Sequence, residues 1–221
     1  MAEEKIVPVL NVPNILTIIR LVMVPLFGWM LLAHPHDPTW RWWTTAVFIV
    51  ALLTDLADGK IARKYNLITN FGKLWDPIAD KAITGMAFVG LSIIGELWWW
   101  VTIIILIREW GITILRFLIV KYGVMAADKL GKMKTLSQTI ALVGLLAPFM
   151  MYVAPAGAVN AGQWLAVGLH WFSMAVMAVA FILTVVSGVN YCREAVGLRR
   201  RWLQAQTNSV DPADPTDPAA P

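Results

Sequence analysis

The sequence predicts an all-α integral membrane protein with six transmembrane helices and both termini in the cytoplasm. Hydrophobic residues make up 58% of the 221 residues and charged residues only 14%. This balance is too apolar for a soluble domain of that size. Apolar segments of about 20 residues, the length that a helix needs to cross a bilayer, recur along the chain. Basic residues gather in alternate connections between these segments.

Six segments are long and apolar enough to be spans. We expect them at residues 15–33, 42–60, 72–95, 97–121, 136–153 and 163–191. Residues 1–13 then form a cytoplasmic N-terminal segment, and residues 14–195 form one six-helix domain. Residues 203–221 are rich in Pro, Asp and Ala and contain almost no large apolar side chain. We expect this tail to be disordered because it cannot bury enough apolar surface to fold.

The distribution of charge predicts the orientation of the spans. The connections after the first, third and fifth spans contain Arg41 as their one basic residue, whereas the other connections and the termini are rich in Lys and Arg. By the positive-inside rule, the basic side is cytoplasmic, which predicts a multi-pass protein of the cell membrane. The tryptophans at 40, 42, 43 and 98–100 then lie at the outer interface. In such a protein a net charge of +4 indicates topology and contact with anionic lipid, and we expect no nucleic-acid partner.

Four aspartates lie at the cytoplasmic edge of two neighbouring spans, in the stretch DLADGKIARKYNLITNFGKLWDPIAD. Asp55 and Asp58 end the second span, and Asp76 and Asp80 begin the third. A helix has 3.6 residues per turn, so residues three or four apart share a face. The spacing therefore predicts that all four carboxylates point into one cleft, and a catalytic or metal site is expected there.

Four negative charges in one cleft repel one another unless some are protonated or cations bind. Hard divalent cations bind carboxylate oxygens, and a pair of such cations bridged by aspartates suits displacement at phosphorus. The alternative is a set of plain salt bridges to Lys60, Arg63, Lys73 and Lys81. The small residues Gly59, Ala62 and Gly72 favour the ligand site, because they let a ring or a pyrophosphate approach the backbone.

The full pattern, Asp55-x2-Asp58-Gly59-x2-Ala62-Arg63-x8-Gly72-x3-Asp76-x3-Asp80, resembles the signature of the CDP-alcohol phosphotransferase family. The resemblance extends over about residues 11–195 and agrees with the six-span layout. It implies transfer of a phosphatidyl or similar group from a CDP-linked donor to an alcohol, with release of CMP. It also implies two divalent cations, Mg²⁺ or Mn²⁺, and a homodimer.

The resemblance implies a role for each signature residue. The metal-binding residues would be Asp55, Asp58, Asp76 and, as a partial ligand, Asp80. The nucleotide-binding residues would be Gly59, Ala62, Arg63 and Gly72. Asp80 would also be the base that takes the proton of the acceptor hydroxyl. No covalent nucleophile is needed, because the acids suit direct in-line attack.

A second group of charges points to the acceptor alcohol. Arg108 and Arg116 lie eight residues apart within the fourth expected span, near one face of the helix, and Lys132 and Lys134 follow in GKMKT. Charges inside a span are costly and are usually functional. Such a cluster suits a phosphate or a carboxylate on the acceptor. We expect Glu109 to pair with a basic residue other than Arg108, because adjacent residues of a helix point about 100° apart.

Three shorter segments resemble one branch of the family, the bacterial phosphatidylglycerophosphate synthases. They are NVPNILTIIRLVMVPLF at 11–27, REWGI at 108–112 and GKMKT at 131–135. This resemblance implies CDP-diacylglycerol as donor and sn-glycerol 3-phosphate as acceptor. Asn14, Thr17 and Arg20 form a strip near the cytoplasmic end of the first span. We expect this strip to face the nucleotide or the metal site, with Asn14 and Thr17 as nucleotide-binding candidates.

Other functions compete with this one. Within the family the acceptor could be inositol phosphate, as in a phosphatidylinositol-phosphate synthase, or serine, or a second phospholipid as in cardiolipin formation. A phosphorylated acceptor explains the basic cluster and serine does not, so inositol phosphate is the strongest competitor. A divalent-cation transporter would place acids along a path through the membrane or in inverted repeats, whereas these acids share one level. A structural scaffold leaves the acids unexplained.

Overall fold

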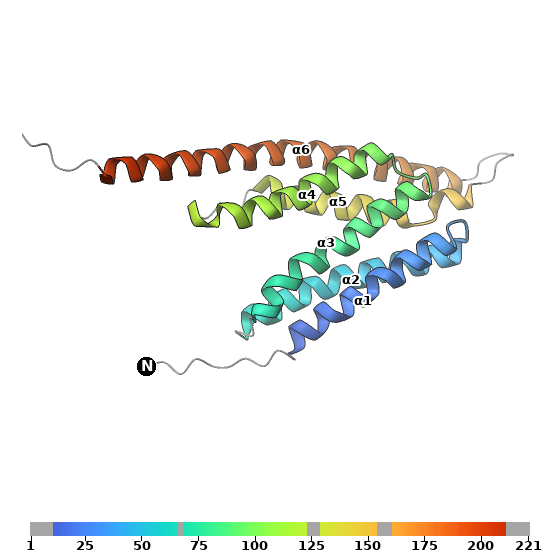
Figure 1. Ribbon diagram of the computed structural model, residues 1–221. Helices are drawn as coiled ribbons and strands as arrows, with labels where there is room; N and C mark the ends of the chain where they lie inside the picture. Colours follow the sequence, from blue (N-terminus) through green and yellow to red (C-terminus); the bar gives the residue numbers. More distant parts are fainter. Residues whose placement is uncertain (1–10, 66–68, 123–128, 154–160, 211–221) are drawn as a thin grey trace, which may run out of the picture.

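The computed structural model describes residues 11–65, 69–122, 129–153 and 161–210 (Figure 1). These residues form six α-helices and two short 3-10 helices, so the protein is all-helical as predicted. The α-helices are α1 (Val12–Ala33), α2 (Pro38–Lys64), α3 (Asn70–Ile93), α4 (Trp99–Ile119), α5 (Lys129–Leu146) and α6 (Ala161–Val210). The 3-10 helices are η1 (Val120–Tyr122) and η2 (Phe149–Tyr152).

Three stretches are long and apolar enough to cross a membrane by length and composition alone: Val12–Ala33, Gly131–Tyr152 and Ala161–Gln204. These stretches agree with the first, fifth and sixth expected spans. Helices α2, α3 and α4 contain the charged residues of the candidate site and several tryptophans, which lower their apolar character. The six-span layout and its orientation therefore stay predictions.

The first three helices begin at side-chain caps. Asn11 accepts a hydrogen bond from the backbone N–H of Asn14, and Asp37 accepts from the N–H groups of Thr39 and Trp40. Thr69 accepts from the N–H of Gly72 at the start of α3. Caps of this kind satisfy N–H groups that have no partner within the helix. They fix where α1, α2 and α3 begin.

The helices pack in two groups that meet along α3 (Figure 1). Helix α1 packs against α2 and α3, and α6 packs against α5 and α4. Helix α3 also contacts α4 and α5. The end of the bundle where α2 ends and α3 begins is called the signature end here. The C-terminus of α4 and the N-terminus of α5 lie at the same end, because successive helices reverse direction.

Small residues let the helices approach closely. A Cβ atom on Gly28 of α1 would lie 2.0 Å from the Cε of Met86 on α3. A Cβ atom on Gly144 of α5 would lie 1.9 Å from the Oγ of Ser173 on α6. Close approach at small residues is a usual way to pack helices in membranes. Each helix group is therefore tightly packed at these contacts.

Arg41 holds the opposite end of the bundle together. Its side chain is only 1% exposed, and its two terminal nitrogens lie 2.8 and 3.0 Å from the carboxylate oxygens of Glu96. It also donates hydrogen bonds to the carbonyl oxygens of Leu145 and Leu146 at the end of α5. A guanidinium group at a helix C-terminus satisfies free carbonyls and interacts favourably with the helix dipole. Arg41 thus joins α2, α5 and the turn that follows α3.

Helix α6 is longer than the sequence analysis predicted. Its 50 residues span about 75 Å at 1.5 Å per residue, and it projects beyond the other helices at the signature end (Figure 1). The sixth span was expected to end at residue 191, and disorder was expected from residue 203. The structure instead continues the helix through residues 203–210, which begin with the helix-favouring run Leu-Gln-Ala-Gln and end with Thr-Asn-Ser-Val. Residues 211–221, which contain the prolines of the tail, lie outside the described residues.

We predict that Arg41→Met lowers the free energy of unfolding by about 3 kcal/mol, because it leaves the Glu96 carboxylate and two carbonyl groups without their partner. Titration with SDS in mixed micelles, followed by circular dichroism, measures this change. His36→Gln, an exposed change in the connection that precedes α2, is the control. An Arg41→Met protein that unfolds at the wild-type SDS fraction contradicts the structural role of Arg41.

Candidate active site

Three of the four predicted aspartates gather at the signature end. Asp55 interacts electrostatically with both Asp76 and Asp80, so α2 and α3 bring these carboxylates together as the spacing predicted. Arg20 of α1 lies among them, with its Nη1 2.7 Å from the Oδ1 of Asp55. The Arg20 side chain is only 1% exposed. A buried guanidinium group thus offsets part of the negative charge.

The other residues of the α1 strip also contact this region. Thr17 donates a hydrogen bond of 2.5 Å to the Oδ1 of Asp76. Asn14 donates one of 2.8 Å to the Oγ1 of Thr69, the cap of α3. A Cβ atom on Gly72 would lie 2.9 Å from the Oδ1 of Asn14, so a larger residue at position 72 would displace the Asn14 side chain. The strip therefore faces the carboxylates, while its role toward a nucleotide stays a prediction.

The remaining signature positions lie on the last two turns of α2. The backbone of Asp58, Gly59, Ala62 and Arg63 is helical, which agrees with the spacing used to predict the cleft. Their side chains fall outside the described part of the chain. The metal-binding role of Asp58 and the nucleotide-binding roles of the other three stay predictions.

A cavity of about 460 Å³ lies between α4, α5 and α6 at the signature end. It is lined by all four residues that were predicted to bind the acceptor, which are Arg108, Arg116, Lys132 and Lys134. Lys81, Glu109, Thr135 and Tyr191 also line it. We call this space the basic cavity. Side chains from α3, α4, α5 and α6 meet there, although the sequence offered only their spacing within each segment.

Glu109 is the acidic member of the basic cavity. Its carboxylate forms an ion pair with the Nζ of Lys134, so the expectation that it holds another basic residue is confirmed. It also lies 3.2 Å from the Nη1 of Arg108, so the expectation that these neighbours do not pair was wrong. The long Arg108 side chain can bend back to the carboxylate. Its Nη2 is held by a 2.7 Å hydrogen bond to Ser187 of α6.

Tyr191 of α6 orders the two arginines. Arg116 donates a 2.8 Å hydrogen bond to the Tyr191 hydroxyl, and its guanidinium carbon lies 4.9 Å from the ring centroid. The guanidinium carbon of Arg108 lies 5.7 Å from the same centroid. Cation–π contacts of this kind favour a fixed position of the charge. Sequence reasoning missed Tyr191 and Ser187, because nothing in the local pattern shows which residues of α6 face α4.

Lys81 connects the basic cavity with the carboxylates. A smaller cavity of about 50 Å³ is lined by Asp80, Lys81, Glu109 and Lys134, among others, and the last three also line the basic cavity. Asp80 interacts electrostatically with Lys81 and Lys134. The predicted base therefore lies beside the basic cavity. Sequence analysis considered Lys81 only as a salt-bridge partner, although its place next to Asp80 was a usable signal.

The donor set at the signature end fits a divalent metal in its chemistry. Asp55, Asp76 and Asp80 offer carboxylate oxygens, which Mg²⁺ and Mn²⁺ prefer. The described side chains do not by themselves bring three or more His, Cys, Asp or Glu groups into metal-binding positions. The fourth predicted ligand, Asp58, is outside that description. Arg20 and Thr17 instead hold two of the carboxylates.

Comparison with known proteins shows which family the chain matches. The profile of the CDP-alcohol phosphatidyltransferase family matches residues 10–186. A protein of Mycobacterium tuberculosis strain H37Rv, named probable phosphatidylglycerophosphate synthase, is 43% identical over 187 residues, covering 84% of this chain and 82% of the relative.

Two proteins named CDP-diacylglycerol–glycerol-3-phosphate 3-phosphatidyltransferase are also similar. The Bacillus subtilis protein is 36% identical over 196 residues, covering 82% of this chain and 93% of its own length. The Cereibacter sphaeroides protein is 32% identical over 212 residues, covering 84% of this chain and 96% of its own length. The resemblance seen in the signature is confirmed, and the chain belongs to the CDP-alcohol phosphatidyltransferase family.

Proposed function

We propose that the protein transfers the phosphatidyl group of CDP-diacylglycerol to sn-glycerol 3-phosphate and releases phosphatidylglycerophosphate and CMP. The observation that carries this proposal is the basic cavity next to Asp80, in which Arg108, Arg116, Lys132 and Lys134 gather. The names of the relatives from Bacillus subtilis and Cereibacter sphaeroides support the same donor and acceptor. The protein is then a phosphatidyltransferase of phospholipid synthesis.

The acceptor phosphate binds in the basic cavity. Arg108 and Arg116 present planar groups that suit two oxygens of a phosphate, and Lys134 adds a point charge. Glu109 holds Lys134 and Arg108 in place before the acceptor arrives. The phosphate anchors one end of glycerol 3-phosphate, which leaves a hydroxyl group at the other end to reach Asp80.

Asp80 takes the proton of that hydroxyl as it attacks the phosphorus of the donor. The small cavity that joins Asp80 to the basic cavity gives the acceptor a path to the base. Arg20, Lys81 and Lys134 interact electrostatically with Asp80 and offset part of the cost of burying its carboxylate as the anion that a base requires. The oxygen of the acceptor forms the new bond to phosphorus as the bond to CMP breaks.

The nucleotide of the donor binds along α2 and α3. Gly59, Ala62 and Gly72 leave room for the cytidine, Arg63 neutralises the diphosphate, and Asn14 and Thr17 approach from α1. Asp55, Asp58, Asp76 and Asp80 would hold two divalent cations, Mg²⁺ or Mn²⁺. Bound there, the cations would offset negative charge on the phosphoryl group and on the departing CMP.

The protein works as a homodimer in the cell membrane, with six spans, both termini in the cytoplasm and the signature end facing the cytoplasm. The basic residues of the signature end and the tryptophans of the opposite end support this orientation. The donor then enters from the surrounding lipid, and the water-soluble acceptor and CMP exchange with the cytoplasm.

An assay of the purified protein with CDP-diacylglycerol and a panel of acceptors tests the proposed function. Glycerol 3-phosphate, inositol phosphate, serine and phosphatidylglycerol are compared by release of CMP. We expect turnover with glycerol 3-phosphate. EDTA should abolish this turnover, and added Mg²⁺ or Mn²⁺ should restore it. If the protein prefers inositol phosphate, the proposed acceptor is wrong. Turnover that resists EDTA would exclude the proposed metal pair.

Asp80→Asn should lower the turnover number by about 100-fold or more, because an amide cannot accept the proton of the acceptor hydroxyl. Binding of CDP-diacylglycerol, measured by calorimetry in detergent, should stay close to that of the wild type. Preserved turnover excludes Asp80 as the base. Loss of donor binding together with turnover would instead assign Asp80 to the donor site.

Arg116→Gln should raise the KM for glycerol 3-phosphate about tenfold and leave the KM for CDP-diacylglycerol unchanged, because it removes one charged contact to the acceptor phosphate. Tyr191→Phe is the matched variant. It keeps the ring under Arg116 and removes only the hydroxyl, so a smaller increase is expected. Equal changes in both KM values would remove Arg116 from the acceptor site.

A further inference from the structure

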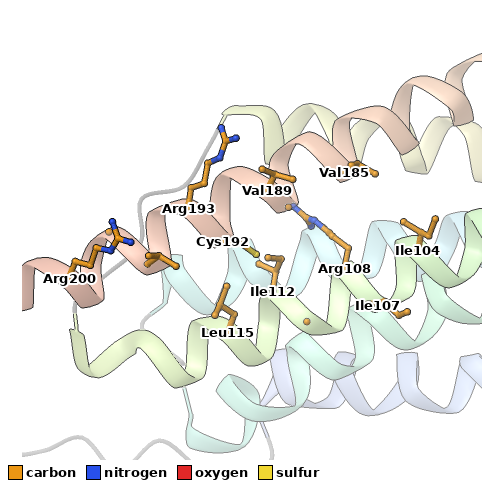
Figure 2. Close-up of a pocket in the computed structure, with 14 residues that line it drawn as sticks. Ile104, Ile107, Arg108, Ile112, Leu115, Val185, Val189, Cys192, Arg193 and Arg200 are labelled. Atoms are coloured by element: carbon orange, nitrogen blue, oxygen red, sulfur yellow. The ribbon is translucent and has the colours of Figure 1, made fainter.

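A long apolar groove of about 960 Å³ runs between α4 and α6 (Figure 2). Its walls consist mainly of aliphatic side chains, such as Ile104, Ile112 and Leu115 of α4 and Val185 and Val189 of α6. All the residues that line it belong to these two helices. The groove is thus separate from the aspartates of α2 and α3, and the proposed reaction does not use it.

The groove becomes basic toward the signature end. Arg193 and Arg200 rise from α6 at its rim, and both are exposed (Figure 2). A second hollow of about 530 Å³ adjoins the groove at Leu115 and Cys192 and is bordered by Arg199. An apolar trough that ends in arginines is complementary to a molecule with an apolar chain and an anionic head.

The length of the groove matches one leaflet of a bilayer together with its headgroup region. From Val185 to Arg200 it follows sixteen residues of α6, which span about 22 Å. One leaflet is about 20–22 Å thick with its headgroups, of which about 15 Å is hydrocarbon. We propose that the groove binds an anionic phospholipid of the surrounding membrane, with an acyl chain along α4 and α6 and the headgroup phosphate at Arg193 and Arg200.

Charge favours a lipid over a second copy of the chain as the occupant. In a two-fold dimer the same surface of both copies meets itself. Contact through this groove would bring Arg193, Arg199 and Arg200 of one copy near those of the other. An anionic headgroup is attracted by the same residues, as basic clusters at a membrane surface attract acidic lipids.

The groove also borders the acceptor site. Arg108 and Ile112 line both the groove and the basic cavity. A Cβ atom on Gly188 would lie 3.1 Å from the Cγ of Arg108, so the stem of Arg108 crosses α6 where no side chain obstructs it. A lipid chain in the groove therefore packs against the stem of an arginine whose charged end faces the acceptor.

Cys192 gives a direct test, because it is the one cysteine of the sequence, is exposed and lines the groove. The full chain is placed in phosphatidylcholine nanodiscs with increasing phosphatidylglycerol of the same acyl composition. The rate at which N-ethylmaleimide alkylates Cys192 is then measured. We expect phosphatidylglycerol to slow alkylation at least about fivefold, since a bound lipid covers the thiol and basic residues hold it.

Two variants separate the groove from the general surface charge. Arg200→Gln should raise the phosphatidylglycerol fraction needed for half-protection about fivefold, as expected for loss of one basic residue at an anionic surface. Lys64→Gln removes one charge at the same end of the bundle, from α2. It should leave the phosphatidylglycerol fraction for half-protection unchanged. Equal shifts in both variants, or no protection at all, overturn the proposal. Oxidative linkage of two Cys192 thiols that is independent of phosphatidylglycerol also overturns it and assigns the groove to a second copy.

Discussion

Burying charge inside an apolar helix bundle is the constraint on which this structure depends. Arg20 meets Asp55 between α1 and α2, and Lys134 meets Glu109 between α5 and α4. Arg41 meets Glu96 at the opposite end. Such pairs add little stability compared with well-packed apolar residues, but removal of one partner is costly. Each pair links different elements, so together they favour one arrangement of the bundle over alternatives that would leave a charge unpaired.

This arrangement divides the candidate site between the two helix groups. Helices α1, α2 and α3 supply the carboxylates with their supporting Arg20 and Thr17, whereas α4, α5 and α6 supply most of the basic cavity. Helix α3 belongs to both, because Asp80 faces the first group and Lys81 lines the second. Adjacent residues on one helix thus bring the proposed base and the proposed acceptor site together, as in-line transfer between two substrates would require.

The sequence predicted the parts of this site that depend on spacing within one helix. The period of 3.6 residues was sufficient to place Asp55 with the aspartates of α3, and to gather Arg108 and Arg116 on one side of α4. Contacts between helices were harder to predict from the sequence. Neither the support of Arg116 by Tyr191 nor the bonds from Arg41 to the end of α5 has a local signal, because they depend on how helices distant in sequence rotate against each other. The pairing of Arg108 with Glu109 was not predicted, because the expectation rested on the 100° angle between adjacent residues. It neglected that the long Arg108 side chain can reach back to the Glu109 carboxylate.

The charge of the basic cavity limits what can bind there. Five basic side chains line it, namely Lys81, Arg108, Arg116, Lys132 and Lys134, and Glu109 is its one carboxylate among the described residues. Four positive charges are left over, which is a costly excess in a partly buried space. A phosphate monoester carries about −1.5 to −2 charges at neutral pH, whereas serine carries no net charge. Charge alone thus separates phosphorylated acceptors from serine. Glycerol 3-phosphate and inositol phosphate carry the same charged group, so under the proposed mechanism they would be distinguished by how their hydroxyl groups reach Asp80 through the small cavity beside Lys81.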